Sequence, residues 1–128
     1  MDAYGLEFVG FTRRKVTAVT QASSPYGLYN FDSGQVFTNE GSTGTVVFSL
    51  PTITDDDDDY KGMWFTFVKL AGQNIAITAQ VGEYIADSSA GGQVQNVEDD
   101  ETYATITLVS VSNNKWMIEG AHGSWVTV

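Results

Sequence analysis

Residues 32–51 read DSGQVFTNEGSTGTVVFSLP, and this stretch decides the fold class. Its two apolar runs are short, and Gly, Ser, Asn and Asp, the residues that favour tight turns, stand on either side of them. Val46, Phe48 and Leu50 fall on one face of an extended chain, which is the period of a β-strand with one buried face. Pro51 then ends the strand, because proline has no backbone N–H to donate to a neighbouring strand.

Similar short runs continue toward the C-terminus. They read GMWFTFV at 62–68 and NIAITA at 74–79, and Ala-Gly-Gln at 71–73 is interpreted as a hairpin turn that pairs them antiparallel. A longer run at 103–111 is joined by Ser-Asn-Asn to a strand at 115–119, a second predicted hairpin. With about eight to ten strands and no helical period, the sequence predicts an all-β fold, an antiparallel β-sandwich or jelly-roll-like domain.

This predicted β-sandwich domain spans residues 25–128, and residues 1–24 form an N-terminal arm or the first strand. The first 24 residues hold three of the six basic residues, so they carry 3 − 2 = +1 against 3 − 14 = −11 in the remainder. In one interpretation the segment is an ordinary first strand, and in the other it packs on a neighbouring chain. Aromatic residues and arginines dominate binding energy at interfaces. The candidate interface residues are Phe8, Phe11, Arg13, Arg14, Lys15 and Trp64.

The composition narrows the classes of partner. The 128 residues carry 16 acidic and 6 basic side chains, a formal net charge of −10, which repels nucleic-acid phosphate and anionic membrane surfaces alike. We therefore expect neither nucleic acid nor membrane as a partner. With no cysteine, the chain has neither disulfides nor thiolate metal sites. The N-terminus lacks the basic and apolar regions of a signal peptide, so synthesis in a cytoplasm is expected.

Five consecutive aspartates, residues 55–59, are the strongest local charge signal. Because they repel one another, the sequence favours a solvated loop. The alternative is a calcium site with Asp55, Asp57 and Asp59 as ligands, since hard cations prefer carboxylate oxygens. The EF-hand spacing fails, however, because Tyr60 occupies the glycine position and Thr66 the position of the last ligand. We expect no cofactor, with Ca²⁺ as the open alternative.

Catalytic chemistry has little support in the sequence. His122 is the only histidine, and it stands two residues from Ser124 in a glycine-containing turn with no G-x-S-x-G motif. A turn or interface histidine is the favoured interpretation, and no enzymatic activity is expected. The tryptophans admit two interpretations, a platform on which a sugar ring stacks, or core and interface anchors. They are Trp64, Trp116 and Trp125.

Several motifs stand in a characteristic order along the last three quarters of the chain. They are DSGQVFTN at 32–39, GTVVFSLP at 44–51, FTFV at 65–68, GEYI at 82–85, and an ending that contains Leu108-Val109, Trp116 and Gly123-Ser124-Trp125. In this order they resemble a small β-domain family of tailed-bacteriophage virion proteins, which includes capsid decoration (cement) proteins and fibre-associated domains. The resemblance implies a structural role without catalytic residues. The Asp55–Asp59 run departs from the family pattern.

Within this family, the resemblance implies one of two functions. A short chain without a shaft or a long repeat favours a decoration protein that binds the major capsid protein on the outer surface of a phage head and stabilises it. Such proteins are typically homotrimers on the virion exterior, made in the host cytoplasm. The strand at 63–70, apolar on both faces, also favours a homotrimer, because a second copy would cover one face. The alternative is a receptor- or glycan-binding module of a fibre or tail.

Overall fold

The structure is a computed structural model that describes residues 13–53, 60–97 and 101–128. Within these ranges the regular elements are strands and two 3-10 turns, joined by turns and loops, so the predicted all-β class is confirmed. The elements are β1 (Val16–Ala18), η2 (Gln21–Ser23), β2 (Tyr26–Gly27), η3 (Asn30–Asp32), β3 (Val36–Thr38), β4 (Val46–Ser49), β5 (Trp64–Val68), β6 (Ile75–Thr78), β7 (Tyr84–Ile85), β8 (Gln93–Asn96), β9 (Thr105–Ser112), β10 (Lys115–His122) and β11 (Val126–Thr127).

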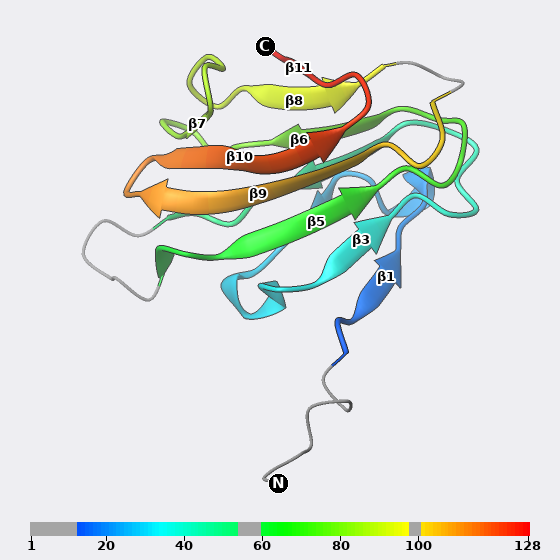
Figure 1. Cartoon of the computed structure of the whole chain (residues 1–128), viewed down its shortest axis with the longest axis horizontal. Coiled ribbons are helices and arrows are strands. Elements are labelled where there is room, and N and C mark those ends of the chain that lie inside the picture. Colours follow the sequence, from blue (N-terminus) through cyan, green and yellow to red (C-terminus); the bar gives the residue numbers. More distant parts are fainter. Residues whose placement is uncertain (1–12, 54–59, 98–100) are drawn as a thin grey trace, which may run out of the picture.

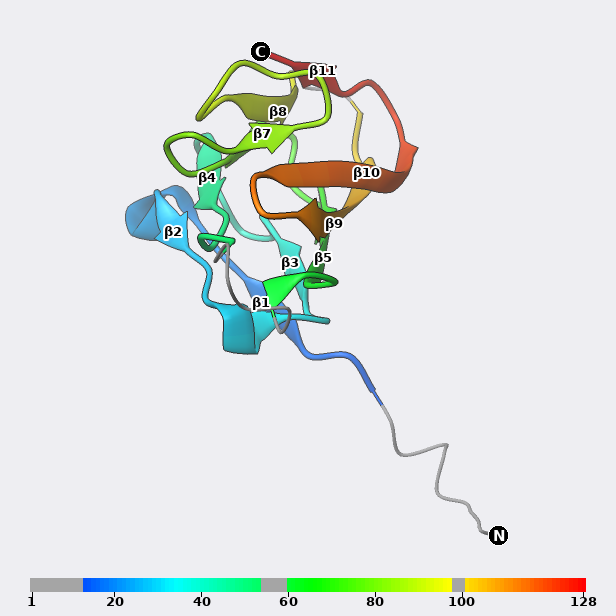
Figure 2. The same cartoon turned by 90° about the vertical axis from the view of Figure 1, so that its left-hand side faces the viewer.

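The strands form two sheets that share one core (Figures 1 and 2). One sheet has six strands in the order β1-β3-β5-β9-β10-β7, and the other has five in the order β11-β8-β6-β4-β2. From β1 to β9 each successive strand lies in the opposite sheet from the one before it. The chain therefore winds between the layers, and strands two apart in sequence become parallel neighbours, as β3 and β5 do in one sheet and β4 and β6 in the other.

This winding overturns the expectation of wholly antiparallel sheets. Five pairs are parallel: β1–β3, β3–β5, β2–β4, β4–β6 and β10–β7. The hairpin predicted at Ala-Gly-Gln 71–73 is wrong, because β5 and β6 lie in different sheets and the turn carries the chain across the core. The hairpin predicted between residues 103–111 and 115–119 is confirmed by β9 and β10, which pair antiparallel.

The predicted alternation explains the core. Phe65 and Phe67 on β5 and Val46 and Phe48 on β4 are buried, whereas the residues between them are more exposed. Buried aromatic rings meet between the layers, with Phe48 and Phe67 only 5.0 Å apart between ring centroids. Burial of such rings is the main favourable contribution to stability in a domain of this size. The other members of this core include Phe37, Leu50, Ile75, Ile77, Ile85, Val94, Ile106, Leu108 and Trp116.

Part of the predicted N-terminal arm belongs to the fold. Residues 16–18 form β1, which pairs parallel with β3 at the edge of the six-stranded sheet. Val19 follows it and is buried, and its backbone N–H donates to the carbonyl of Thr38 at 2.8 Å. The interpretation as a first strand therefore describes residues 16–18. Residues 1–12, with Phe8 and Phe11, lie outside the described residues.

Candidate interaction surface

Figure 1 views the outer face of the six-stranded sheet from the front. This face carries a row of apolar side chains. The register places Trp64 of β5 opposite Val109 of β9, and Val109 opposite Met117 of β10. Because Phe65 and Leu108 point into the core, these three residues point outward. Trp64 is 37% and Met117 41% exposed, so the fold leaves this apolar row accessible to a partner.

An open hollow of about 380 Å³ lies at one end of the apolar row. It is lined by Gly62, Trp64, Val109 and Glu119. Glu119 supplies a carboxylate at the rim of an otherwise apolar surface, so this spot offers both apolar contact and an acceptor for a basic group.

Arg14 contacts the same tryptophan from the N-terminal side. Its Cζ lies 4.2 Å from the centroid of the Trp64 ring, a cation–π contact that contributes about 0.5–1 kcal/mol at an exposed site. The Nε atom donates to the carbonyl of Gly34 at 2.9 Å, and Nη2 donates to Oγ1 of Thr66 at 2.9 Å. These contacts fix the guanidinium over the sheet and hold the start of β1 in place.

The structure thus brings together two of the predicted interface residues, Arg14 and Trp64, which are 50 positions apart in the sequence. Arg13 and Lys15 flank Arg14 and are exposed. All three basic residues precede β1, the edge strand of its sheet, so a positive group stands at one edge of a molecule with net charge −10. We call Arg13, Arg14 and Lys15 the basic edge.

The other predicted sites have different outcomes. Asp55, Asp57 and Asp59 lie outside the described residues, and within the described ranges the structure has no group of three Asp, Glu or His residues suited to a metal ion. His122 is exposed at the end of β10, where its carbonyl accepts a hydrogen bond from Nε1 of Trp125. Ser124 Oγ donates to Glu101 at 3.3 Å, so the described contacts pair this serine with a carboxylate.

The three tryptophans do not form one platform. Trp116 is fully buried, with its ring 5.9 Å from that of Phe65, and is therefore a core residue that no glycan can reach. Trp125 is half-buried and packs against the core. Only Trp64 belongs to the exposed outer face of the six-stranded sheet.

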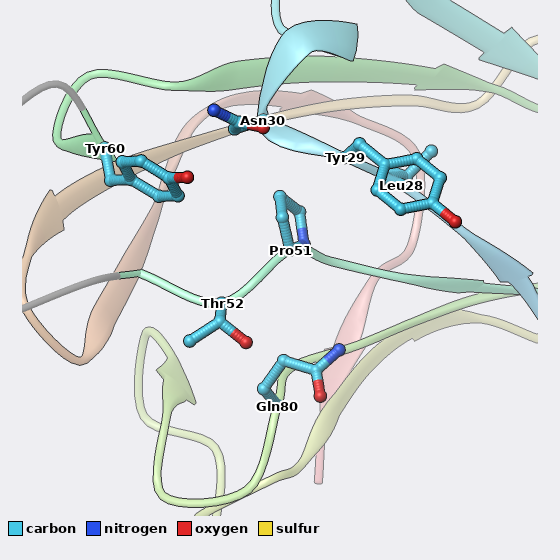
Figure 3. Close-up of a pocket in the computed structure, with 7 residues that line it drawn as sticks. All are labelled: Leu28, Tyr29, Asn30, Pro51, Thr52, Tyr60 and Gln80. Atoms are coloured by element: carbon cyan, nitrogen blue, oxygen red, sulfur yellow. The ribbon is translucent and has the colours of Figure 1, made fainter.

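A second hollow, of about 390 Å³, was not predicted from the sequence (Figure 3). Tyr29 and Tyr60 flank Pro51 in this view, and the amides of Asn30 and Gln80 stand at its margin. Tyr29 is 60% exposed and its ring stacks on Phe31 at 5.1 Å, nearly parallel. The only sequence signal for this site is the concentration of aromatic residues in YGLYNF at 26–31. In the structure β2 covers only Tyr26–Gly27, and a 3-10 turn follows.

Neither a scan against protein-family models nor a search of the curated proteins finds a match to this chain. Among the residues that the structure describes, no helix has the length and apolar character needed to cross a membrane.

Proposed function

We propose that the protein is a non-enzymatic structural component of a bacteriophage virion. In this proposal it is a decoration (cement) protein with a sandwich-like, jelly-roll-related domain, which binds the major capsid protein on the outer surface of the head and stabilises the shell. The resemblance in motif order supports the virion assignment, and the two-sheet all-β architecture is consistent with it.

The observation that carries the proposal is the contact between Arg14 and Trp64. It joins a basic segment at one sheet edge to the apolar row on the adjacent face. The two together form one surface that offers both charged and apolar contacts to a partner. Arginine and tryptophan are the residue types that most often dominate binding energy when a partner desolvates them. The aliphatic part of an arginine side chain also covers apolar surface while its guanidinium group reaches a carboxylate.

Charge gives this surface a preferred partner. The chain has net charge −10, so it repels another acidic surface overall, and the basic edge is the place where such a surface is attracted. A capsid surface that presents carboxylates beside an apolar patch would therefore be approached in one orientation. Electrostatic complementarity of this kind mainly raises the association rate and selects the orientation.

Electron microscopy of virions that carry the protein tests this function. We expect copies spread over the exterior of the head. The variants Arg14→Ala and Trp64→Ala should each lower occupancy on the heads at least about tenfold, because hot-spot truncation costs about 2 kcal/mol or more. Circular dichroism and urea denaturation establish that the variants are folded. Copies confined to a fibre or tail tip would contradict the proposal.

The second hollow supports an alternative, a receptor- or glycan-binding module of a fibre or tail. Its tyrosine rings and amide groups, from Tyr29, Tyr60, Asn30 and Gln80, are the types of group that stack on sugar rings and bind hydroxyls. The variant Tyr29→Ala is the matched control for Trp64→Ala, since both remove an exposed aromatic ring. Head occupancy that depends on Trp64 supports decoration. Binding to host polysaccharide that depends on Tyr29 supports the fibre module.

A further inference from the structure

A lysine and an asparagine meet inside the core, at the ends of strands from different sheets. Lys69 directly follows β5, and the alternation that buries Phe65 and Phe67 points its side chain inward as well. Asn96 is the last residue of β8, in the five-stranded sheet. Both side chains are fully buried, at 0% exposed.

A chain of hydrogen bonds links these two side chains to the carboxylate of Glu101. Nζ of Lys69 donates to Oδ1 of Asn96 at 2.9 Å. Nδ2 of Asn96 donates to Oε1 of Glu101 at 2.7 Å and to the carbonyl of Ser124 at 2.9 Å. The backbone of Lys69 is fixed too, since its N–H donates to the carbonyl of Ala104 at 2.9 Å.

The hydrogen bond brings a nucleophile close to an electrophilic carbon. Because a C=O bond is about 1.23 Å long, Nζ at 2.9 Å from Oδ1 lies no more than about 4.1 Å from Cγ of Asn96. Attack proceeds from a contact of about 3–3.5 Å, so Nζ and Cγ lie at most about 1 Å beyond that contact. Burial of both groups excludes the water that would compete as a nucleophile.

We propose that Lys69 and Asn96 form an intramolecular isopeptide bond, and that Glu101 carries the protons for the reaction. In the first step a proton passes from the Lys69 ammonium to Oδ1 of Asn96 while Nδ2 gives one to the Glu101 carboxylate, which leaves a neutral amine and the imidic-acid form of the Asn96 side chain. The neutral amine then attacks Cγ, a new C–N bond forms, and the electron pair of the C=N bond moves to Nδ2. Oε1 of Glu101 lies 2.7 Å from Nδ2, in position to return the proton to the leaving nitrogen.

The atoms and charges of the reaction balance without any further reactant. The bond from Cγ to Nδ2 breaks as the C=O bond re-forms, the attacking nitrogen and Oδ1 each release one proton by way of Glu101, and the leaving nitrogen takes up both and departs as ammonium. The Lys69 ammonium and the Asn96 carboxamide thus become one secondary amide and NH₄⁺, and neither oxidation nor reduction occurs. The backbone N–H of Ser124, and then the Asn96 side chain, hold the pKa of Glu101 below its ordinary value of 4.5. The carboxylate is therefore ionised at neutral pH and able to accept the first proton.

Such a bond would tie β5 to β8 and so lock the two sheets together at one end. A covalent link between segments distant in sequence stabilises a fold mainly by restricting the unfolded chain, as a disulfide does. In a chain without cysteine this is a route to the same stabilisation.

The mass of the intact, denatured protein tests the proposal directly. Loss of ammonia lowers the mass by about 17 Da relative to the sequence. Digestion with trypsin locates the change, because the enzyme does not cut after an acylated lysine. With the bond, residues 62–115 remain one peptide that is lighter by the same amount. Without it, cleavage after Lys69 gives peptides 62–69 and 70–115.

Two variants separate the reaction from a purely structural role. Lys69→Arg keeps a buried cation and Glu101→Gln keeps the shape of the acid, and both should show the full mass that their sequences predict. A wild-type protein with full mass and normal cleavage after Lys69 overturns the proposal. A loss of about 17 Da with cleavage retained also overturns it, because that result indicates a cyclised asparagine.

Discussion

Glu101 illustrates how one side chain acquires a pH-dependent role from its position. It accepts a hydrogen bond from the backbone N–H of Ser124 at 2.7 Å and another from Asn96 at 2.7 Å. These donors favour the ionised carboxylate, so the pKa of Glu101 is lower in the folded protein than its ordinary value of 4.5. The stabilisation is therefore fully present above that value and is lost as the pH falls through the lower, folded-state pKa.

We expect Glu101→Gln to lower the melting temperature at neutral pH, and the difference from wild type to shrink from about pH 5 downward. Thermal unfolding followed by circular dichroism between pH 3 and about 7 measures this difference. A covalent link lost in the variant would add a difference that is the same at every pH, so only the pH-dependent part reports the carboxylate. Glu40→Gln, on the exposed turn after β3, corrects for removing one negative charge. A difference that stays constant down to pH 3 would contradict the expectation.

The sequence correctly predicted which residues are buried where buried and exposed side chains alternate along a strand. The alternation around Val46 and Phe48 is observed, and Trp64 lies on the exposed face of β5, opposite the buried Phe65. The burial of Lys69 was not predicted, because charged side chains are rarely buried without a partner. Its partner, Asn96, comes from another sheet, and no local pattern links the two residues.

At the scale of elements, the sequence predicts strands more reliably than their partners. Residues 69–74 separate β5 from β6. Six extended residues span up to about 20 Å, whereas facing sheets are only about 10 Å apart, so the same connection can make a hairpin or cross the core. The sequence Ala-Gly-Gln is compatible with a hairpin and with a connection that crosses the core. The choice depends on β3 and β9, which occupy the two sides of β5 in its own sheet.

The strand β1 gives a prediction at this scale. We compare a variant that lacks residues 1–12 with one that lacks residues 1–20. The longer deletion removes β1 and the buried Val19, so it should lower the free energy of unfolding by about 2–3 kcal/mol relative to the shorter one. Urea denaturation of both variants measures this difference, and equal stability would show that β1 adds nothing to the fold.

The shorter deletion also tests the arm. It removes Phe8 and Phe11 and keeps Arg14 with its contact to Trp64. If the first twelve residues contact the capsid, this variant should remain folded and bind heads more weakly than the full chain. Binding at full affinity would restrict the capsid interface to the basic edge and Trp64.

At the scale of the whole molecule, the oligomeric state depends on which face of β5 the chain covers itself and which face it leaves exposed. The sequence indicated a strand that is apolar on both faces and therefore favoured a homotrimer. One face is covered by the chain's own core, through Phe65 and Phe67. On the other face Val109 and Met117, toward β10, are open to a second copy, whereas Trp64 lies at the end of the row nearer β1, beneath Arg14, and stays available to the capsid. A contiguous apolar surface of this kind is usually buried in an interface.

We therefore expect a homotrimer, with a mass three times the 13.9 kDa of one chain, in light scattering at micromolar concentration. Each copy carries net charge −10, so the copies repel one another and association should strengthen as added salt screens that repulsion. Met117→Lys places a further charge in the apolar row and should give monomers. Val81→Lys, at a position 98% exposed, adds the same charge outside the row and should leave the trimer intact. A wild-type monomer at every salt concentration would contradict the trimer, and dissociation by both lysine variants would contradict the assignment of its interface to the apolar row.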